Sequence, residues 1–282
     1  MLMAFFHLRG QESCYPTSFS FGLFAVILLG MVGLFVGSPV SAIETETVTY
    51  RDGDVTMRGY RAYPDDRQQP RPGILIIHQW KGLGEYEKRR ARQLARMGYV
   101  AFAGDIYGAD TRPSTNHEAA MASSTFRKDR NFYRKRVKLA LEVLRKDKRV
   151  RSEDLAAIGY CFGGTGVLEL ARSGTRLDAV VSFHGGLSNP APEKNQTIHP
   201  VVQVHHGAND PHVSQEDVRA FWDEMKNSEA DWDLNIYSDA VHSFTEKRAG
   251  DDPSTGTAYN ERADELSWQR MQLLFQRVFS SP

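Results

Sequence analysis

Cys161 lies in a sequence pattern that is typical of a nucleophile. The segment Gly159-Tyr160-Cys161-Phe162-Gly163-Gly164 is a G-x-S-x-G nucleophile elbow with cysteine in the serine position. Apolar residues 155–158 predict a buried strand before it, and residues 167–172 predict a helix after it. In this context the thiol would stand above the edge of a sheet, with the Phe162 amide free to face a developing oxyanion. Buried cysteines are usually inert, so the interpretation depends on an acid and a histidine further along the chain.

Two candidate partners for this thiol follow later in the chain, each directly after a predicted strand. Asp210 lies in a Gly-Ala-Asn-Asp-Pro turn after the strand expected over residues 201–205. His242 follows the strand expected over residues 232–237. Loops that follow parallel strands meet at the carboxyl edge of the sheet. The chain order of nucleophile, acid and histidine is that of α/β-hydrolases, so the sequence predicts a triad of Cys161, Asp210 and His242.

Each residue type in this triad suits a distinct step of nucleophilic chemistry. A thiolate is the reactive form of cysteine, and a neighbouring imidazole can hold Cys161 in that form. His242 would protonate the leaving alcohol and later activate water against the thioester. Asp210 would accept the imidazole N–H and fix its tautomer. Two alternatives stay open, because Asp210 can be a turn former alone and Asp239 lies closer to His242 in the sequence.

The first 42 residues differ in composition from the rest of the chain. Residues 19–36 are almost uncharged and rich in Phe, Leu, Val, Ile and Gly. Small residues at Val40 and Ala42 fit a signal-peptidase site, so residues 1–42 are expected to be a signal peptide that directs export to the periplasm or the medium. The apolar run approaches membrane-spanning length, and the alternative is an N-terminal anchor that is not cleaved.

Cleavage after Ala42 would leave a single thiol in the protein. It would remove Cys14, and Cys161 would be the only cysteine of the mature chain. A lone cysteine in an oxidising compartment cannot form an internal disulfide, so it is either buried and inert or a reactive group.

The sequence from residue 43 to residue 282 predicts a single α/β domain. Residues 44–50 and 56–63 predict an antiparallel hairpin around an Asp-Gly-Asp turn. The aliphatic run 73–77 predicts the first of several strands that are buried on both faces. Strands that alternate with helices imply right-handed crossovers. The expected fold is a three-layer α/β-hydrolase sandwich with a mostly parallel central sheet and an N-terminal antiparallel hairpin.

Two neighbouring segments are expected to differ in structure. The polar residues 109–124 are expected to be irregular and to form a rim or lid over the site. Residues 126–145 are expected to form one long amphipathic helix, because apolar residues recur along them at helical spacing.

Composition and charge narrow the class of partner. The chain of 282 residues has 35 basic and 35 acidic side chains, a balance that gives no indication of a nucleic acid partner. Neither a C-x-x-C pair nor an H-E-x-x-H spacing is present, so no metal site and no cofactor are expected. The expected partner is a small molecule.

Several blocks of the sequence together resemble one known family. The blocks are His78-Gln79-Trp80-Lys81-Gly82-Leu83, residues 89–98, Asp105-Ile106-Tyr107-Gly108, the elbow, the Asp210 turn and His242-Ser243-Phe244. They occur in order from about Gly73 to the C-terminus and resemble the dienelactone hydrolase family. That resemblance implies an α/β-hydrolase that acts on esters and lactones through a Cys, Asp, His triad.

The resemblance also implies the remaining site residues. It places the triad on Cys161, Asp210 and His242, and it implies that the backbone amides of Trp80 and Phe162 are the oxyanion donors. The same blocks hold the residues expected to line the pocket: His78, Gln79, Tyr107, Tyr160 and Phe244. Trp80 and Tyr160 could equally serve packing, and three further histidines after the elbow, His184, His205 and His206, are interpreted as structural or rim residues.

Two departures from the family pattern bear on activity and substrate. The family carries a glutamate, which helps to generate the thiolate, where this chain has Gln79; the sequence leaves open a standing thiolate–imidazolium pair or a weakly active thiol. The family's carboxylate-binding arginines are replaced by Ala109 and Glu246, with Arg112 and Lys247 nearby. These replacements argue against a dienelactone substrate and leave an ester or lactone as the expectation.

The sequence therefore predicts an exported hydrolase that cleaves a small ester or lactone through a thioester acyl-enzyme intermediate. A membrane tether is expected only if residues 19–36 are retained. Two alternatives remain open: a catalytically weak or silent binding protein of the cell envelope, and an enzyme that cleaves a thioester or a peptide bond.

Overall fold

The structure, a computed structural model, describes residues 42–65 and 70–279. The expected signal peptide or membrane anchor lies outside the described residues except for Ala42. Within the described ranges, no helix is long and apolar enough to cross a bilayer.

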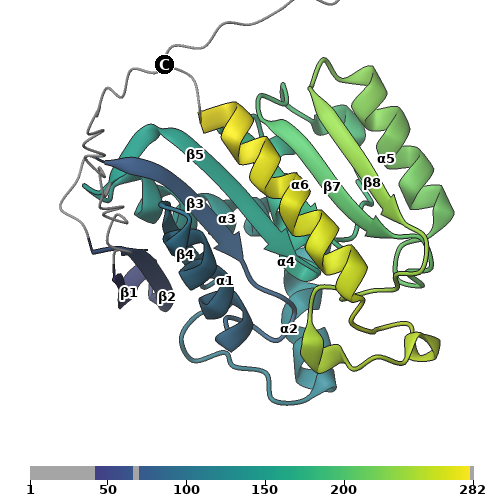
Figure 1. The fold of residues 1–282 in the computed structure, drawn as a ribbon, viewed down its shortest axis with the longest axis horizontal. Coiled ribbons are helices and arrows are strands. Elements are labelled where there is room, and N and C mark those ends of the chain that lie inside the picture. Colours follow the sequence, from purple (N-terminus) through teal and green to yellow (C-terminus); the bar gives the residue numbers. More distant parts are fainter. Residues whose placement is uncertain (1–41, 66–69, 280–282) are drawn as a thin grey trace, which may run out of the picture. The chain divides into compact units, whose positions relative to one another are not determined.

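Strands and helices alternate along most of the chain (Figure 1). The strands are β1 (Ile43–Asp52), β2 (Val55–Pro64), β3 (Arg71–Ile77), β4 (Val100–Gly104), β5 (Val150–Tyr160), β6 (Ala179–Phe183), β7 (Val201–Gly207) and β8 (Trp232–Tyr237). The α-helices are α1 (Glu85–Arg96), α2 (Asn116–Lys128), α3 (Arg130–Arg145), α4 (Phe162–Arg172), α5 (Gln215–Asn227) and α6 (Glu261–Phe279).

All eight described strands belong to one sheet, in the order β1-β2-β4-β3-β5-β6-β7-β8. The β1–β2 hairpin is antiparallel and joins β4 in antiparallel register, whereas β3 to β8 run parallel to one another. Gly53 supplies the positive φ of 59° that the hairpin turn requires. The predicted fold, a mostly parallel sheet with an N-terminal antiparallel hairpin, is confirmed.

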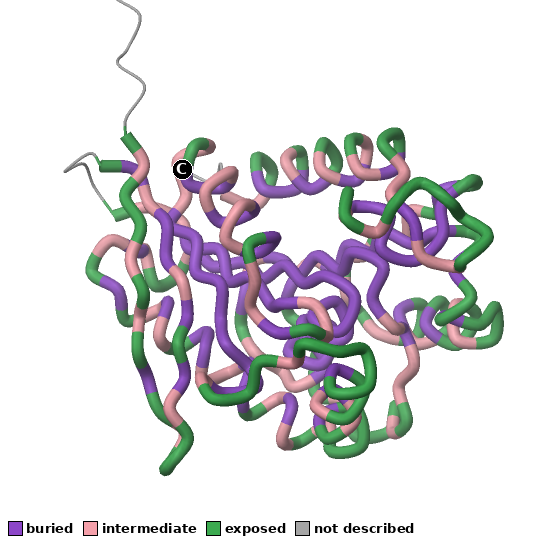
Figure 2. The backbone as a smooth tube through the Cα atoms, turned by 90° about the horizontal axis from the view of Figure 1, so that it is seen from below, coloured by how far each residue is buried: buried purple, intermediate pink, exposed green. Residues whose placement is uncertain are grey.

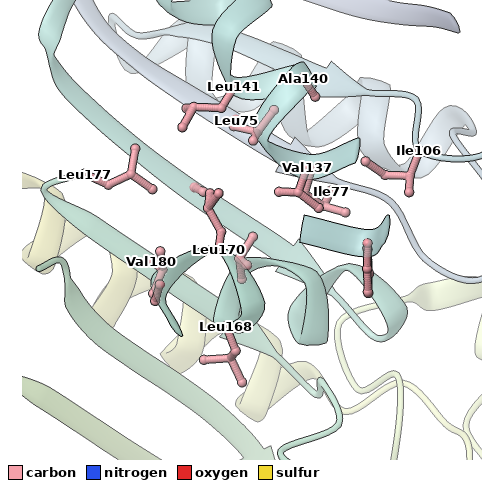
Figure 3. Close-up of a cluster of buried hydrophobic side chains, with 14 of the residues drawn as sticks. Leu75, Ile77, Ile106, Val137, Ala140, Leu141, Leu168, Leu170, Leu177 and Val180 are labelled. Carbon is pink, nitrogen blue, oxygen red and sulfur yellow. The ribbon is translucent and has the colours of Figure 1, made fainter. Parts of the chain in front are cut away.

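The sheet is buried between two layers of helices because its central strands are apolar on both faces. Alternate side chains of β3 point to opposite faces: Leu75 and Ile77 pack with α3 and α4, and Ile74 and Ile76 pack with α1 and α6. Figure 3 shows the first of these clusters, in which Val137 lies near Ile77. In Figure 2 the central strands are almost entirely buried, while β1 at the edge of the sheet is mostly exposed or half-buried.

The segment between β4 and β5 corrects two predictions. Residues 109–124 are not wholly irregular, because α2 begins at Asn116, where the Thr115 hydroxyl caps it by accepting the Glu118 amide at 3.2 Å. The single helix predicted over residues 126–145 is two helices that meet at Asp129. The Asp129 carboxylate accepts the Phe132 amide at 2.9 Å and so begins α3.

The turn between β5 and α4 requires glycines at positions where nearby backbone atoms leave no room for a Cβ. A Cβ added to Gly159 would lie 2.0 Å from the Gly163 carbonyl oxygen, and one added to Gly163 would lie 2.1 Å from the Ile77 carbonyl oxygen. Real Cβ atoms do not approach backbone so closely. The elbow therefore lets α4 leave the sheet within one residue of Cys161, directly beside the end of β3.

Replacement of Gly163 by alanine tests this crowding. We expect Gly163→Ala to lower the free energy of unfolding by about 1–3 kcal/mol or more, because the added methyl group meets backbone and not a flexible side chain. Urea denaturation measures the change. Gly84→Ala is the control, since its added Cβ meets the Glu87 carboxylate at 3.6 Å and the Gly82 carbonyl oxygen at 4.0 Å, both ordinary contact distances; an equal loss in both variants would contradict the crowding argument.

Candidate active site

Cys161 occupies a strained turn between β5 and α4. Its φ of 54° and ψ of −115° are unusual for a residue with a side chain, and such conformations cost on the order of 1–3 kcal/mol. Its amide donates to the Phe183 carbonyl at 3.0 Å and to Nδ1 of His184 at 3.1 Å. These two bonds to the end of the neighbouring strand β6 hold the turn in place.

Cys161, His242 and Asp210 form one hydrogen-bonded chain. Nε2 of His242 lies 3.0 Å from Sγ of Cys161, and its Nδ1 lies 2.8 Å from Oδ2 of Asp210. Because a carboxylate accepts hydrogen bonds, Nδ1 carries a proton and Nε2 is the nitrogen that faces sulfur. The other oxygen of Asp210 accepts the His212 amide at 2.8 Å, which fixes the carboxylate. The structure thus brings together the three side chains that the sequence singled out.

The alternative acid, Asp239, lies elsewhere. Its exposed carboxylate accepts the Ser238 hydroxyl at 3.3 Å, and it makes no hydrogen bond to His242. The backbone of His242 is held by a different segment: its amide donates to the Gly256 carbonyl at 3.2 Å, and its carbonyl accepts the Ala258 amide at 3.1 Å. The ring is therefore fixed from both its backbone and Asp210.

The charges of Cys161 and His242 stabilise each other. Burial acts to raise the pKa of the Cys161 thiol, but the charge and hydrogen bond of His242 outweigh it, and the pKa falls below its ordinary 9.0. Burial acts to lower the pKa of His242, but the Cys161 thiolate and the bond to Asp210 reverse this and raise it well above 6.5. Of the two states that the sequence leaves open, the geometry favours a standing thiolate–imidazolium pair.

The backbone amides of Phe162 and Trp80, the predicted oxyanion donors, belong to residues that lie at or near Cys161. The Phe162 amide begins α4 and donates a hydrogen bond toward the Cys161 sulfur. Trp80 follows β3 and lines the same pocket as Cys161. Across residues 42–65 and 70–279, no hydrogen-bond acceptor is paired with the Trp80 amide. A backbone amide that points to the sulfur and an unpaired amide in the same pocket are the kind of donors that can stabilise a negative oxygen.

Cys161 and Trp80 line a pocket of about 320 Å³. Its wall includes Cys161 and His242, together with Trp80, His212 and two basic residues, Arg127 and Arg130. The predicted pocket residues His78, Gln79, Tyr107, Tyr160 and Phe244 are not part of this wall, so that prediction is corrected.

His78 and Tyr107 are packed behind the pocket, where they support the loop after β3. The fully buried His78 ring bonds to the Gln79 carbonyl at 2.6 Å and accepts the Ile106 amide at 3.1 Å. Burial lowers the pKa of His78 to about 4, so its ring is neutral. The Tyr107 hydroxyl donates to the Trp80 carbonyl at 2.9 Å. Both side chains position the backbone of Trp80 and do not face the pocket.

The other three predicted pocket residues also have different surroundings. The side-chain amide of Gln79 points to Glu246 at 3.5 Å and makes no hydrogen bond to Cys161. Tyr160 is fully buried and stacks on Phe183, with ring centroids 4.7 Å apart. Phe244 is fully buried in a separate apolar cluster. Successive side chains of a strand point to opposite faces, so a residue next to a site residue at the end of a strand commonly faces away from the site.

The basic residues of the pocket were not found from the sequence. Arg112 binds the Asp105 carboxylate at 2.9 Å, and Lys247 lies over the Tyr259 ring at 5.2 Å, so neither faces the pocket. Arg127 and Arg130 line the pocket from either side of the point where α2 ends and α3 begins. No glycine or proline in the sequence indicated that the helix ends there.

His184 is a further residue whose place the sequence did not reveal. It follows β6, is fully buried and contacts the Cys161 amide, so of the two predicted roles, structural or rim residue, it has the structural one. Parallel pairing of Tyr160 with Phe183 puts the two following residues, Cys161 and His184, side by side. The pairing of β5 with β6 was the signal that could have found it.

Comparison with known proteins places this geometry in a family. The sequence model of the dienelactone hydrolase family matches residues 57–279. The chain belongs to the dienelactone hydrolase family. Its members are hydrolases of the ester and lactone type, and this chain is such a hydrolase.

Similar proteins agree with this membership. A solved dienelactone hydrolase-like promiscuous phosphotriesterase from metagenomic libraries is 36% identical, with a TM-score of 0.80 over 84% of this chain and 99% of that one. A solved structure named m3DLH is 35% identical, with a TM-score of 0.81 over the same shares. A Bradyrhizobium protein described as a probable 2-oxo-3-(5-oxofuran-2-ylidene)propanoate lactonase is 27% identical over 184 residues, which is 62% of this chain and 74% of the relative.

Loss of the Asp210 charge tests the ion pair of this dienelactone hydrolase homologue. We expect Asp210→Asn to raise the thiol pKa of Cys161 by about one pH unit or more, because the amide no longer stabilises the imidazolium beside the sulfur. Titration of the thiolate by its ultraviolet absorbance measures the shift. Asp239→Asn is the matched control and leaves the curve unchanged; a shift in the control, or none in Asp210→Asn, contradicts the assignment.

Proposed function

We propose that this protein cleaves a small ester or lactone through an acyl thioester on Cys161. The observation that supports this most directly is that one ring, that of His242, contacts both the sulfur of Cys161 and the carboxylate of Asp210 at the wall of a pocket. The side-chain amide of Gln79, the residue in the family's glutamate position, makes no hydrogen bond to the sulfur. Thiolate formation therefore rests on His242 and Asp210.

The first half of the reaction transfers the acyl group to sulfur. The Cys161 thiolate attacks the carbonyl carbon, and the carbonyl oxygen becomes negative within reach of the Phe162 and Trp80 amides. The carbon–oxygen single bond of the ester then breaks. The leaving alkoxide takes the Nε2 proton of the His242 imidazolium. In a lactone the resulting alcohol stays attached to the acyl group.

The second half returns the enzyme to its starting state. Neutral His242 accepts a proton from water as the water oxygen attacks the thioester carbonyl. The carbon–sulfur bond breaks, the carboxylic acid product leaves, and sulfur departs as the thiolate beside the renewed imidazolium. One water is consumed in each cycle, and Asp210 orients the ring through its hydrogen bond to Nδ1.

The pocket wall favours a substrate that carries a negative group. Nε and Nη1 of Arg130 are buried and have no hydrogen-bond partner among the described residues. Its neighbour Glu169 is already bonded to Arg134 at 2.8 Å and to Arg172 at 3.1 Å. Arg127 makes no ion pair within the described chain. Burial of the Arg130 guanidinium atoms without a partner is costly, and an anionic ligand would supply one, while the exposed Arg127 adds a second positive charge at the same wall.

None of the described residues that line the pocket is acidic, so Arg127 and Arg130 give the pocket wall a positive charge. We therefore propose an ester or lactone with an additional carboxylate or similar oxyanion, bound by Arg127 and Arg130. This charge comes from the α2–α3 junction at Asp129 and not from the positions of Ala109 and Glu246.

We also propose that the protein is exported, periplasmic or secreted, on the strength of the sequence of residues 1–42. The mass and N-terminal sequence of the protein recovered outside the cytoplasm test this. A chain that begins at Ile43 supports cleavage, a full-length chain that sediments with membranes supports an anchor formed by residues 19–36, and a full-length cytoplasmic protein contradicts the proposal.

Removal of the sulfur tests the covalent intermediate. With a 4-nitrophenyl ester we expect a burst of about one nitrophenolate per chain, followed by slower turnover, because acylation of Cys161 precedes hydrolysis of the thioester. Cys161→Ala abolishes both phases, whereas a surface change such as Lys128→Gln leaves them intact. Persistence of the burst in Cys161→Ala contradicts the proposal.

The charge preference has its own test. In the double variant Arg127→Gln, Arg130→Gln we expect kcat/KM for 4-nitrophenyl hydrogen glutarate to fall about 10- to 100-fold, the effect of losing a charge-assisted hydrogen bond. The neutral 4-nitrophenyl valerate changes by less than about 3-fold, and Lys128→Gln affects neither ester. Equal losses with both esters would mean that the arginines act on the thiol or the fold and not on the substrate.

A further inference from the structure

His184 has two polar ring atoms, and each contacts a different loop of the site. It lies directly after β6, is fully buried, and adopts a φ of 41°, a strained value for a residue with a side chain. Nδ1 is 3.1 Å from the amide nitrogen of Cys161, and Nε2 is 2.9 Å from the hydroxyl of Thr245. Cys161 carries the sulfur, and Thr245 lies three residues after His242.

The hydrogen bonds define the protonation of this ring. Nδ1 accepts the Cys161 amide, so it carries no proton, and Nε2 must carry the proton that it donates to Thr245. Burial lowers the pKa of His184 far below its ordinary value, and the positive charge of His242 acts in the same direction. The two rings are 5.3 Å apart, edge to face. His184 therefore stays neutral beside an imidazolium.

Thr245 connects the ring to the helices on the far side of the sheet. Its hydroxyl lies 2.6 Å from the Tyr86 hydroxyl, which accepts Nε of Arg90 at 3.1 Å. Because that Tyr86 oxygen accepts from Arg90, its own proton points to Thr245. Arg90 in turn binds Asp264 of α6. Thr245 is thus fixed in place from α1 and α6, and His184 is tied to that fixed point.

Two strained residues support each other in this arrangement. Cys161 and His184 both have positive φ, and they follow the paired residues Tyr160 and Phe183 of neighbouring parallel strands. The Cys161 amide has two acceptors, the Phe183 carbonyl and the His184 ring. Loss of the ring would leave the elbow with one acceptor and would cut the link between the elbow and the loop that carries His242.

From these contacts we propose that His184 is a positioning residue that fixes the distance between Cys161 Sγ and His242 Nε2 by bonding the two loops that carry them. The proposal rests on the proposed function, because it concerns the same sulfur and ring. The His184 ring bonds the Cys161 amide and the Thr245 hydroxyl and not the sulfur, and His184 is absent from the pocket wall, so it acts through Cys161 and Thr245 and not on the substrate.

Three substitutions of His184 separate its two bonds. Asn places a polar atom near Nδ1, Gln places one near Nε2, and Leu removes both bonds. We expect His184→Leu to lower kcat about 100-fold with KM within about 2-fold, because small displacements of reacting groups have effects of that size. The thiol pKa of Cys161 rises toward 9.0 in the same variant. Asn and Gln lie between Leu and the unchanged protein in both measurements.

Thr245 supplies a second test that does not alter the buried ring. Thr245→Val removes the hydroxyl at nearly constant volume and is expected to lower kcat about 10-fold, whereas Thr245→Ser keeps the hydroxyl and restores kcat to within about 2-fold. If His184→Leu does not fold, this pair decides the matter. Equal kcat values and equal thiol titrations in Thr245→Val and Thr245→Ser, or unchanged kcat and thiol pKa in folded His184→Leu, overturn the proposal.

Failure of this proposal is distinguishable from failure of the proposed function. If Cys161→Ala keeps the burst, the thioester mechanism is wrong whatever the His184 variants do. If Cys161→Ala is inactive while the His184 and Thr245 variants behave as the unchanged protein, the mechanism stands and only the positioning role is wrong.

Discussion

The contact between Sγ of Cys161 and Nε2 of His242, 3.0 Å long, is the interaction on which the rest of the site depends. Neither group would be charged alone in this surrounding, because burial opposes the charge on both. Together, with Asp210 on the far side of the ring, they form a pair whose charges stabilise each other. Thiolate formation is therefore a property of the geometry, and a small separation of the two loops would remove it.

The surroundings determine which of several buried histidines carries charge. His78, His184 and His205 are fully buried, and burial lowers the pKa of each, so all three are neutral and serve as hydrogen-bonding groups. His242 is buried as well, but it contacts a carboxylate and a thiol. Burial thus lowers the pKa of three histidines, whereas the neighbours of His242 raise its pKa, and the difference lies in those neighbours.

Sequence reasoning predicted the parts of this protein whose signals are local. The elbow around Cys161, the turn of Asp210 and the position of His242 each follow a recognisable strand, and parallel strands bring such loops to one edge. The break at Asp129 was missed because helix-forming residues lie on both sides of it. The start of α2 could have been predicted from the Thr-x-x-Glu capping box that precedes it. The pocket wall was mispredicted because the side-chain directions in the loops depend on tertiary packing.

A mass measurement on the enzyme during turnover tests the central claim most directly. The protein is mixed with a reactive ester, quenched in acid within the burst, and digested for peptide mass spectrometry. The account predicts one acyl group per chain, located on the sulfur of Cys161 and released by hydroxylamine. An acyl group on another residue, or hydrolysis at full rate with no acylated peptide at any quench time, would contradict it.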